Sequence, residues 1–143
     1  MMAQYNAWQN SQLLPVLKAM PAEELTKERG AIFGSIQRTL SHLLWGDTLW
    51  ISRFDGGEGV PVGNIQKHAD LWPTMIEWAP QREFCDARIR RWADGLQGAD
   101  LSGDFTWNYS DTGEAVSRPF GLVITHFFNH QTHHRGQVHT MLT

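Results

Sequence analysis

Residues 125–137 read THFFNHQTHHRGQ, a run in which histidines alternate with aromatic and polar side chains. His126, His130 and His134 recur every four residues, and His133 and His139 bring this region to five of the chain's seven histidines. Side chains four residues apart on an α-helix are neighbours, with Cβ atoms about 5–6 Å apart. Two imidazoles placed in this way can bind one divalent metal ion, so the run predicts a helix that carries a metal site.

The segments before this run predict a small hairpin that leads into the last helix. Residues 105–109 and 115–118 have strand-like composition and are separated by a turn that contains Asp-Thr-Gly. Pro119 then opens the last helix, which we expect to run to about Met141.

Three further stretches, residues 3–19, 32–54 and 72–96, have apolar residues near helical spacing. A short helical piece is expected after Pro21, and the glycine-rich residues 55–63 are expected to form a mobile loop. Four long helices with one hairpin predict an all-α protein, a four-helix bundle with a small β-hairpin before the last helix. The sequence has no internal repeat or linker, so residues 1–143 are expected to form one domain.

Composition and charge argue against several classes of function. The net charge is −3, from 12 basic and 15 acidic residues, with no basic face to displace counterions from phosphates, so nucleic-acid binding is not expected. No apolar run is long enough to span a membrane, and residues 1–6 lack the pattern of a secretory signal. Cys85 is the only cysteine, so an internal disulfide is impossible, and these features together predict a cytoplasmic protein. The seven tryptophans indicate a bulky aromatic core or an aromatic-lined pocket.

A metal site in a bundle needs ligands from facing helices. His42 is the natural partner, because it is the only histidine of the predicted second helix and lies among leucines. On the last helix the pair can be His126 with His130 or His130 with His134, and the spacing leaves both open. The alternative to a metal site is that these histidines form a solvent-exposed, histidine-rich end of the chain. Phe127 and its apolar neighbours favour instead a segment that is packed in the core.

Other metal chemistries lack the residues that they require. A zinc-protease helix needs His-Glu-x-x-His, but Phe127 follows His126 and Gln131 follows His130. No Glu-x-x-His pair of a di-iron bundle is present, and one cysteine does not suit the usual four-ligand structural zinc site. A site of three histidines is therefore expected to leave one position open to water or a ligand.

Residues around the ligands are expected to orient the imidazoles. Asp47 can accept a hydrogen bond from a ligand imidazole or can form an ion pair with Arg53 or Arg135. Asn129 and Gln137 can also orient imidazoles, whereas His133 and His139 are expected at the surface or behind the ligands. These last two residues lie off the direction shared by His130 and His134.

Three segments together resemble the DinB family: residues 5–8, residues 34–53 and, above all, Asn129–Gln137, which reads NHQTHHRGQ. The likeness extends from about residue 3 to the end of the chain. It implies an up-down-down-up bundle that forms a homodimer, and it implies induction by DNA damage or other stress, without DNA binding.

The resemblance also implies a divalent transition metal held by His42, His130 and His134. Nickel or zinc is the expected metal, ahead of manganese or iron, although imidazole ligation does not decide among them. Some proteins of similar fold are thiol-dependent transferases and isomerases that use low-molecular-weight thiols such as bacillithiol or mycothiol.

These observations favour a metal-dependent enzyme of the thiol S-transferase type that acts on small electrophiles. Its expected partners are a small-molecule ligand or thiol and a second copy of the chain, and not a nucleic acid or a membrane. The alternatives are a metal-dependent hydrolase and a non-catalytic stress-response bundle in which the metal is structural.

Overall fold

The computed structural model describes residues 1–60, 65–109 and 112–143, with the backbone alone at 65 and 66. Its elements are, in order, α1 Met2–Ala19, α2 Ala22–Thr26, α3 Ile36–Asp55, the 3₁₀ helix η1 Ile65–Asp70, α4 Met75–Asp94, the 3₁₀ helix η2 Gly98–Leu101, β1 Asp104–Asn108, β2 Ala115–Pro119 and α5 Phe120–Leu142. The predicted all-α class, with a hairpin before the last helix, is confirmed.

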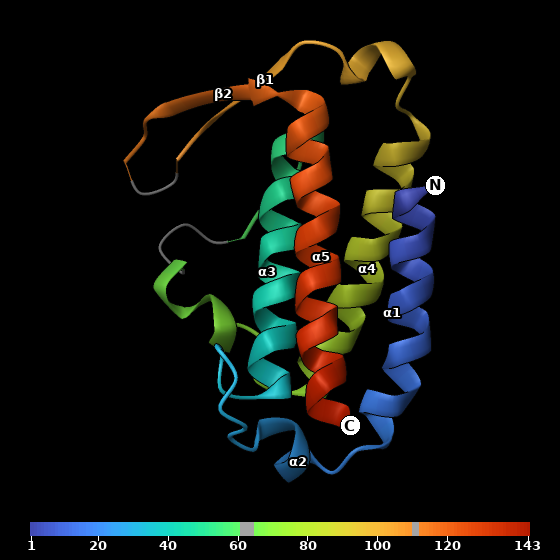
Figure 1. Cartoon of the computed structure of the whole chain (residues 1–143), viewed down its shortest axis with the longest axis vertical. Coiled ribbons are helices and arrows are strands. Elements are labelled where there is room, and N and C mark those ends of the chain that lie inside the picture. The colour runs from blue at the N-terminus through green and yellow to red at the C-terminus, as the bar shows by residue number, and fades with distance from the viewer. Residues whose placement is uncertain (61–64, 110–111) are drawn as a thin grey trace.

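The four long helices lie side by side in the up-down-down-up order that the DinB resemblance implies (Figure 1). α1 and α5 run one way along the long axis, and α3 and α4 run the other way. Because α3 and α4 are parallel, the chain between them must return along the bundle, and it does so through η1, which packs against α3. α5 packs chiefly on α3, and α1 packs chiefly on α4. The seam between α3 and α5 is thus one place where segments distant in sequence meet.

The helix starts differ from the predicted ones for local reasons. The second helix was expected from Ile32, but Gly34 has φ +82°, a left-handed conformation that interrupts a helix, and Ser35 caps the new start by accepting from the Arg38 amide. The third was expected from residue 72 but begins at Met75, after Thr74, which forms a capping box with Glu77. Pro15 and Pro80 lie inside α1 and α4, respectively, without ending them.

The hairpin has the predicted position. β1 and β2 are antiparallel, with Phe105 opposite Arg118 and Trp107 opposite Val116. Side chains alternate between the faces of a strand, so these four lie on one face, and all but Arg118 are partly buried. The turn residues 110–111 lie outside the described residues, as do residues 61–64 of the expected loop; residues 56–60 of that loop are non-helical.

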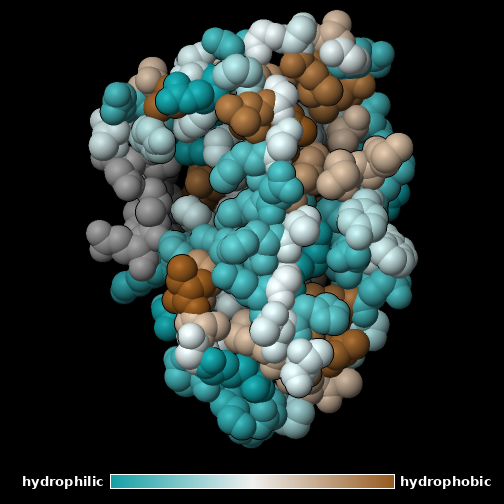
Figure 2. Space-filling view, in the orientation of Figure 1, coloured by the Kyte–Doolittle hydropathy of each residue, from teal (hydrophilic) through white to brown (hydrophobic). Residues whose placement is uncertain are grey.

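Apolar side chains from all four long helices form the core. Leu17, Ile51, Ile89, Phe127 and Val138 are fully buried, and each such side chain contributes about 1.5–3 kcal/mol through removal from water. Trp78 is also buried, and its Nε1 donates to the Leu40 carbonyl at 2.9 Å. The face seen in Figure 2 is hydrophilic along its centre, with hydrophobic residues in separate groups. Among the described helices, none is both long and apolar enough to cross a membrane.

A buried polar network crosses the core and joins the helices. Arg82 of α4 donates to Asp47 of α3 at 2.5 Å and to Asp86 at 2.7 Å. Asp86 in turn accepts from Asn10 of α1, and Arg135 of α5 donates to Asn10 at 3.4 Å. Each charged group in this network has a hydrogen-bonding partner, which a buried charge requires.

Candidate metal centre

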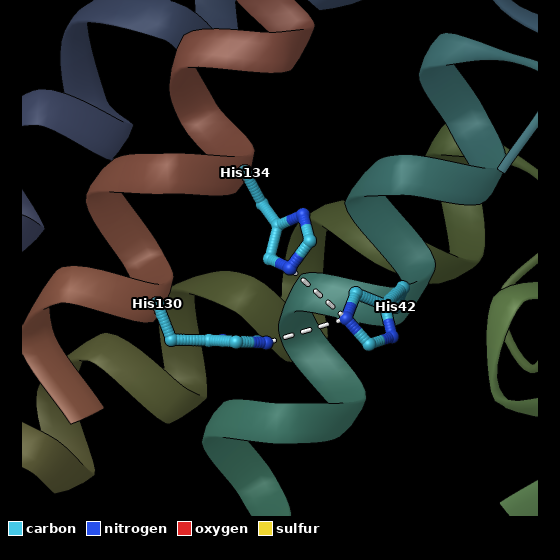
Figure 3. Close-up of side chains that lie close together, drawn as sticks. All are labelled: His42, His130 and His134. Atoms are coloured by element: carbon cyan, nitrogen blue, oxygen red, sulfur yellow. Dashed lines mark hydrogen bonds between the residues drawn. The ribbon is translucent and has the colours of Figure 1, made fainter. Parts of the chain in front are cut away.

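Three imidazoles converge on one point at the seam between α3 and α5 (Figure 3). His42 projects from α3, while His130 and His134 project from successive turns of α5. Nε2 of His42 lies 3.2 Å from Nε2 of His134 and 3.3 Å from Nε2 of His130. One ring nitrogen from each residue lies within 4.8 Å of the other two. The structure therefore brings together the three residues that the DinB resemblance singled out.

These separations suit a common ion. Imidazole nitrogens bound to zinc at about 2.0–2.1 Å, with a tetrahedral angle between them, lie about 3.3 Å apart. Burial, with smaller contributions from the neighbouring imidazoles, lowers the pKa of His42 to about 3 and that of His130 to about 4. Burial also lowers the pKa of His134. The rings are thus neutral near pH 7, which is the form that binds metals.

Gly46 of α3 makes room for the His130 ring. A Cβ atom at Gly46 would lie 2.9 Å from Cε1 of His130, closer than non-bonded carbon atoms approach. Glycine at this position therefore allows the ring to lie directly against the α3 backbone. Gly46 lies one helical turn after His42, but nothing in the sequence pattern marks it as part of the site.

Two further side chains contact the outer nitrogens of the clustered rings. Nδ1 of His134 lies 2.7 Å from Oε1 of Gln137, and Nδ1 of His42 lies 3.0 Å from Nδ1 of His68. The glutamine oxygen can only accept, so Nδ1 of His134 carries the proton and Nε2 keeps its lone pair. If His42 likewise binds through Nε2, its Nδ1–H donates to His68. Such outer contacts fix the tautomer and orientation of metal-binding histidines.

Aromatic rings surround the cluster. Phe33 stacks on His42 with a centroid distance of 4.1 Å, and Trp45 stacks on His68 at 4.8 Å. His42 is 9% exposed and His134 7%. Phe33 and Trp45 both stack on His42 and so contribute to the burial that lowers its pKa.

The other histidines of α5 do not join the cluster. His126 is exposed, and its ring lies 5.9 Å from that of Trp50, so the structure selects the His130–His134 pair. His133 and His139 are exposed, as predicted, and His133 contacts Gln137 behind His134, with 3.2 Å between Nε2 atoms. Gln137 has the orienting position expected of it, whereas Asn129 is exposed.

Asp47 forms a buried ion pair, but its partner is Arg82 and not the expected Arg53 or Arg135. Its Oδ2 accepts from Arg82 of α4 and its Oδ1 accepts from Gln131 at 3.0 Å, so the partners of both oxygens are side chains other than the imidazoles of the cluster. Arg53 and Arg135, the expected ion partners, donate elsewhere. Arg82 lies 35 residues from Asp47 on another helix, and no sequence pattern connects the two.

Sequence reasoning also missed His68. This residue lies in η1, outside the four long helices and 26 residues from His42. In the sequence, His68 is an isolated histidine between a glycine-rich segment and a proline, without a second histidine at helical spacing. Only the fact that it is a histidine could have pointed to a site. Its place beside His42 depends on the return of the chain along α3.

The protein is thus a four-helix bundle in which three neutral imidazoles between two helices could hold a divalent metal ion. Comparison with known sequences gives the family. The DinB family model matches residues 1–143, and the chain therefore belongs to the DinB family. It is 27% identical to Protein DinB of Bacillus subtilis (strain 168) over 142 residues, a match that covers 97% of this chain and 81% of that protein.

Proposed function

We propose that this protein is a metal-dependent thiol S-transferase that acts on small electrophiles, with one divalent ion, nickel or zinc, held by His42, His130 and His134. The observation that carries the proposal is the donor set. Three neutral imidazoles from α3 and α5 converge, and no carboxylate or cysteine belongs to the described cluster, so a divalent ion held there would have at least one coordination position left for an external ligand.

The thiol must come from outside the chain. Cys85, the single cysteine, is 3% exposed in α4, and burial raises the pKa of its thiol to about 11. A buried, protonated thiol is a poor nucleophile. A low-molecular-weight thiol is therefore the expected source of reactive sulfur.

In the proposed reaction, the sulfur of the small thiol forms a bond to an electrophilic carbon. The leaving group departs with the electron pair of its bond, and the thiol proton passes to solvent. A divalent ion bound at the cluster supplies Lewis acidity that favours the thiolate form of a thiol. Gln137 and His68 hold His134 and His42 in their ligand orientation, and the rings of Phe33 and Trp45 limit access of water.

Cobalt-substituted protein tests the proposal. The protein is titrated with cysteine, bacillithiol and mycothiol, with serine as the oxygen-containing control. At least one thiol should produce a sulfur-to-metal charge-transfer band that serine does not produce. That same thiol should then react faster with 1-chloro-2,4-dinitrobenzene, with chloride released in equal amount. The His130→Ala protein should lose both effects, whereas His133→Ala, which changes an exposed neighbour, should keep them.

The structural-metal alternative gives a different result. If metal binds stoichiometrically but no thiol changes the cobalt spectrum or reacts faster, the transferase proposal is wrong and the metal has a structural role.

A further inference from the structure

A second site lies beside the metal centre, between the hairpin and the upper ends of α3 and α5. A cavity of about 500 Å³ is lined there by Trp50, Arg53, Trp107, Tyr109, Arg118 and His126, together with two aliphatic side chains of α5. Cavities of roughly 300–1,000 Å³ are typical of small-molecule sites. The hairpin leans outward from these helix ends in Figure 1. Its strands contribute Trp107 from β1 and Arg118 from β2 to the lining of the cavity.

The charge of the lining is one-sided. Two guanidinium groups and an imidazole line the cavity, and none of the described lining residues is acidic. Arg53 is half-buried, and its nearest acceptor is the Asn108 carbonyl at 3.5 Å; Arg118 donates to the carbonyl of its neighbour Ser117. Neither forms an ion pair within the described part of the chain.

Arginines that are shielded from water elsewhere in this protein differ from Arg53 in their partners. Arg29, Arg82 and Arg88 each contact a carboxylate, and buried Arg135 is held by two asparagine side chains. Burial lowers the pKa of Arg53, which indicates a charge that gains from a counterion. The cavity therefore suits an anion, and a carboxylate matches the planar fork of a guanidinium group.

The walls suit a flat ring. Trp50 and Trp107 meet edge to face with centroids 5.3 Å apart, and the Arg53 guanidinium carbon lies 4.8 Å from the Trp50 ring. Tyr109 continues the aromatic wall at 6.5 Å from Trp107. Aromatic faces of this kind bind planar apolar groups through dispersion and stacking.

The cavity adjoins the metal centre through His126. The ring of His126 lies 6.0 Å from that of His130, one turn along the same helix. A molecule with its charged end at the arginines and its ring on the tryptophans would thus lie next to the three-histidine cluster.

We infer that this cavity binds small aromatic carboxylates, through Arg53 and Arg118 on the carboxylate and Trp50 and Trp107 on the ring. The further statement that such a molecule is the electrophilic substrate rests on the proposed function. The binding itself does not, because the cavity residues are separate from the three ligand histidines.

Calorimetric titration with 2-naphthoate tests the inference, with 2-naphthylmethanol as the neutral probe of the same shape. The wild-type protein should bind naphthoate and should bind the alcohol at least tenfold more weakly. Arg53→Gln and Arg118→Gln should each weaken naphthoate binding by about tenfold or more, since each removes a charged hydrogen-bond donor to the carboxylate. Arg90→Gln, which changes an exposed arginine of α4, should have no effect. Arg118 is exposed on β2, so its replacement leaves the fold intact.

Metal-free protein and His130→Ala separate this inference from the proposed function. Both should bind naphthoate as the wild type does. If naphthoate binds only to the metal-loaded protein, or if neither arginine substitution weakens it, the cavity assignment is wrong. If naphthoate binds as expected but no thiol changes the spectrum of the cobalt protein, the cavity assignment is correct and the transferase proposal is wrong.

Discussion

Gly46 of α3 leaves the space that the His130 ring occupies. A Cβ atom there would lie 2.9 Å from the ring, so Gly46→Ala should displace the imidazole rather than the helix backbone. Alanine favours a helix over glycine by about 1 kcal/mol, so the metal-free variant should be at least as stable as the wild type. Metal affinity, measured by competition with a chromogenic chelator, should fall by about 10–100-fold, as it does when metal ligands lose their orientation.

Gly136→Ala is the matched control for this change. Gly136 also lies in a helix, but no atom lies within 4 Å of a Cβ built on it. Its replacement should leave metal affinity unchanged. If the Gly46→Ala protein bound metal as tightly as the wild type does, the His130 ring would not be held against Gly46 as described.

Sequence spacing identified the histidines of the three-residue cluster only in part. His126 and His134 are both four residues from His130, so periodicity cannot choose between them. What separates them is the partner helix: His134 meets His42, while His126 lies beside Trp50. His68 was beyond reach of the sequence, because its contact with His42 arises from the path of a connection.

At the scale of elements, the buried network fixes α4 against α3 and α1. Arg82→Ala should leave Asp47 and Asp86 as uncompensated buried carboxylates, at a cost of about 3–5 kcal/mol in the free energy of unfolding. Urea denaturation of metal-free protein measures this loss. Arg90→Ala, an exposed change on the same helix, should alter stability by less than about 0.5 kcal/mol. If Arg82→Ala lowered the free energy of unfolding by less than about 0.5 kcal/mol as well, the buried network around Arg82 would be contradicted.

Element types were predictable from the sequence, and boundaries were less so. Apolar periodicity gave the four long helices, and strand-like residues around a turn gave the hairpin. The start of α3 was missed because the left-handed glycine at Gly34 interrupts a pattern that otherwise reads as helical from Ile32. The Asp47–Arg82 pair was missed because it depends on which helices are neighbours.

On the scale of the whole molecule, a metal ion at the cluster would join α3 to α5. An ion that binds only the folded chain stabilises it by about 2.7 kcal/mol when free metal is 100 times the dissociation constant. For a chain of this size, that corresponds to a rise of about 5–10 °C in melting temperature. Scanning calorimetry of metal-free and metal-loaded protein measures the shift. The same concentration of metal should not stabilise the His134→Ala protein, and an equal shift in that variant would place the ion elsewhere.

The stability of the metal-free protein should depend on pH through the same cluster. Burial holds the pKa of His42 at about 3 and that of His130 at about 4, whereas histidine in an unfolded chain has a pKa near 6.5. Between these values the unfolded chain binds more protons than the folded chain, so stability falls as the pH is lowered through this range. Urea midpoints at about pH 7 and about pH 5 should differ less in His42→Leu than in the wild type. An equal difference would show that His42 is not buried in its neutral form.

The homodimer implied by the family resemblance stays a prediction, which light scattering of the purified protein can check.

Elemental analysis of untagged protein, after loading and dialysis, is the most direct test of an ion shared between α3 and α5. The wild type and His133→Ala should each retain one divalent ion per chain. His130→Ala and His134→Ala should retain none, and His42→Ala should retain almost none because it removes the ligand from the second helix. Full metal content in His42→Ala would contradict a site built across the two helices.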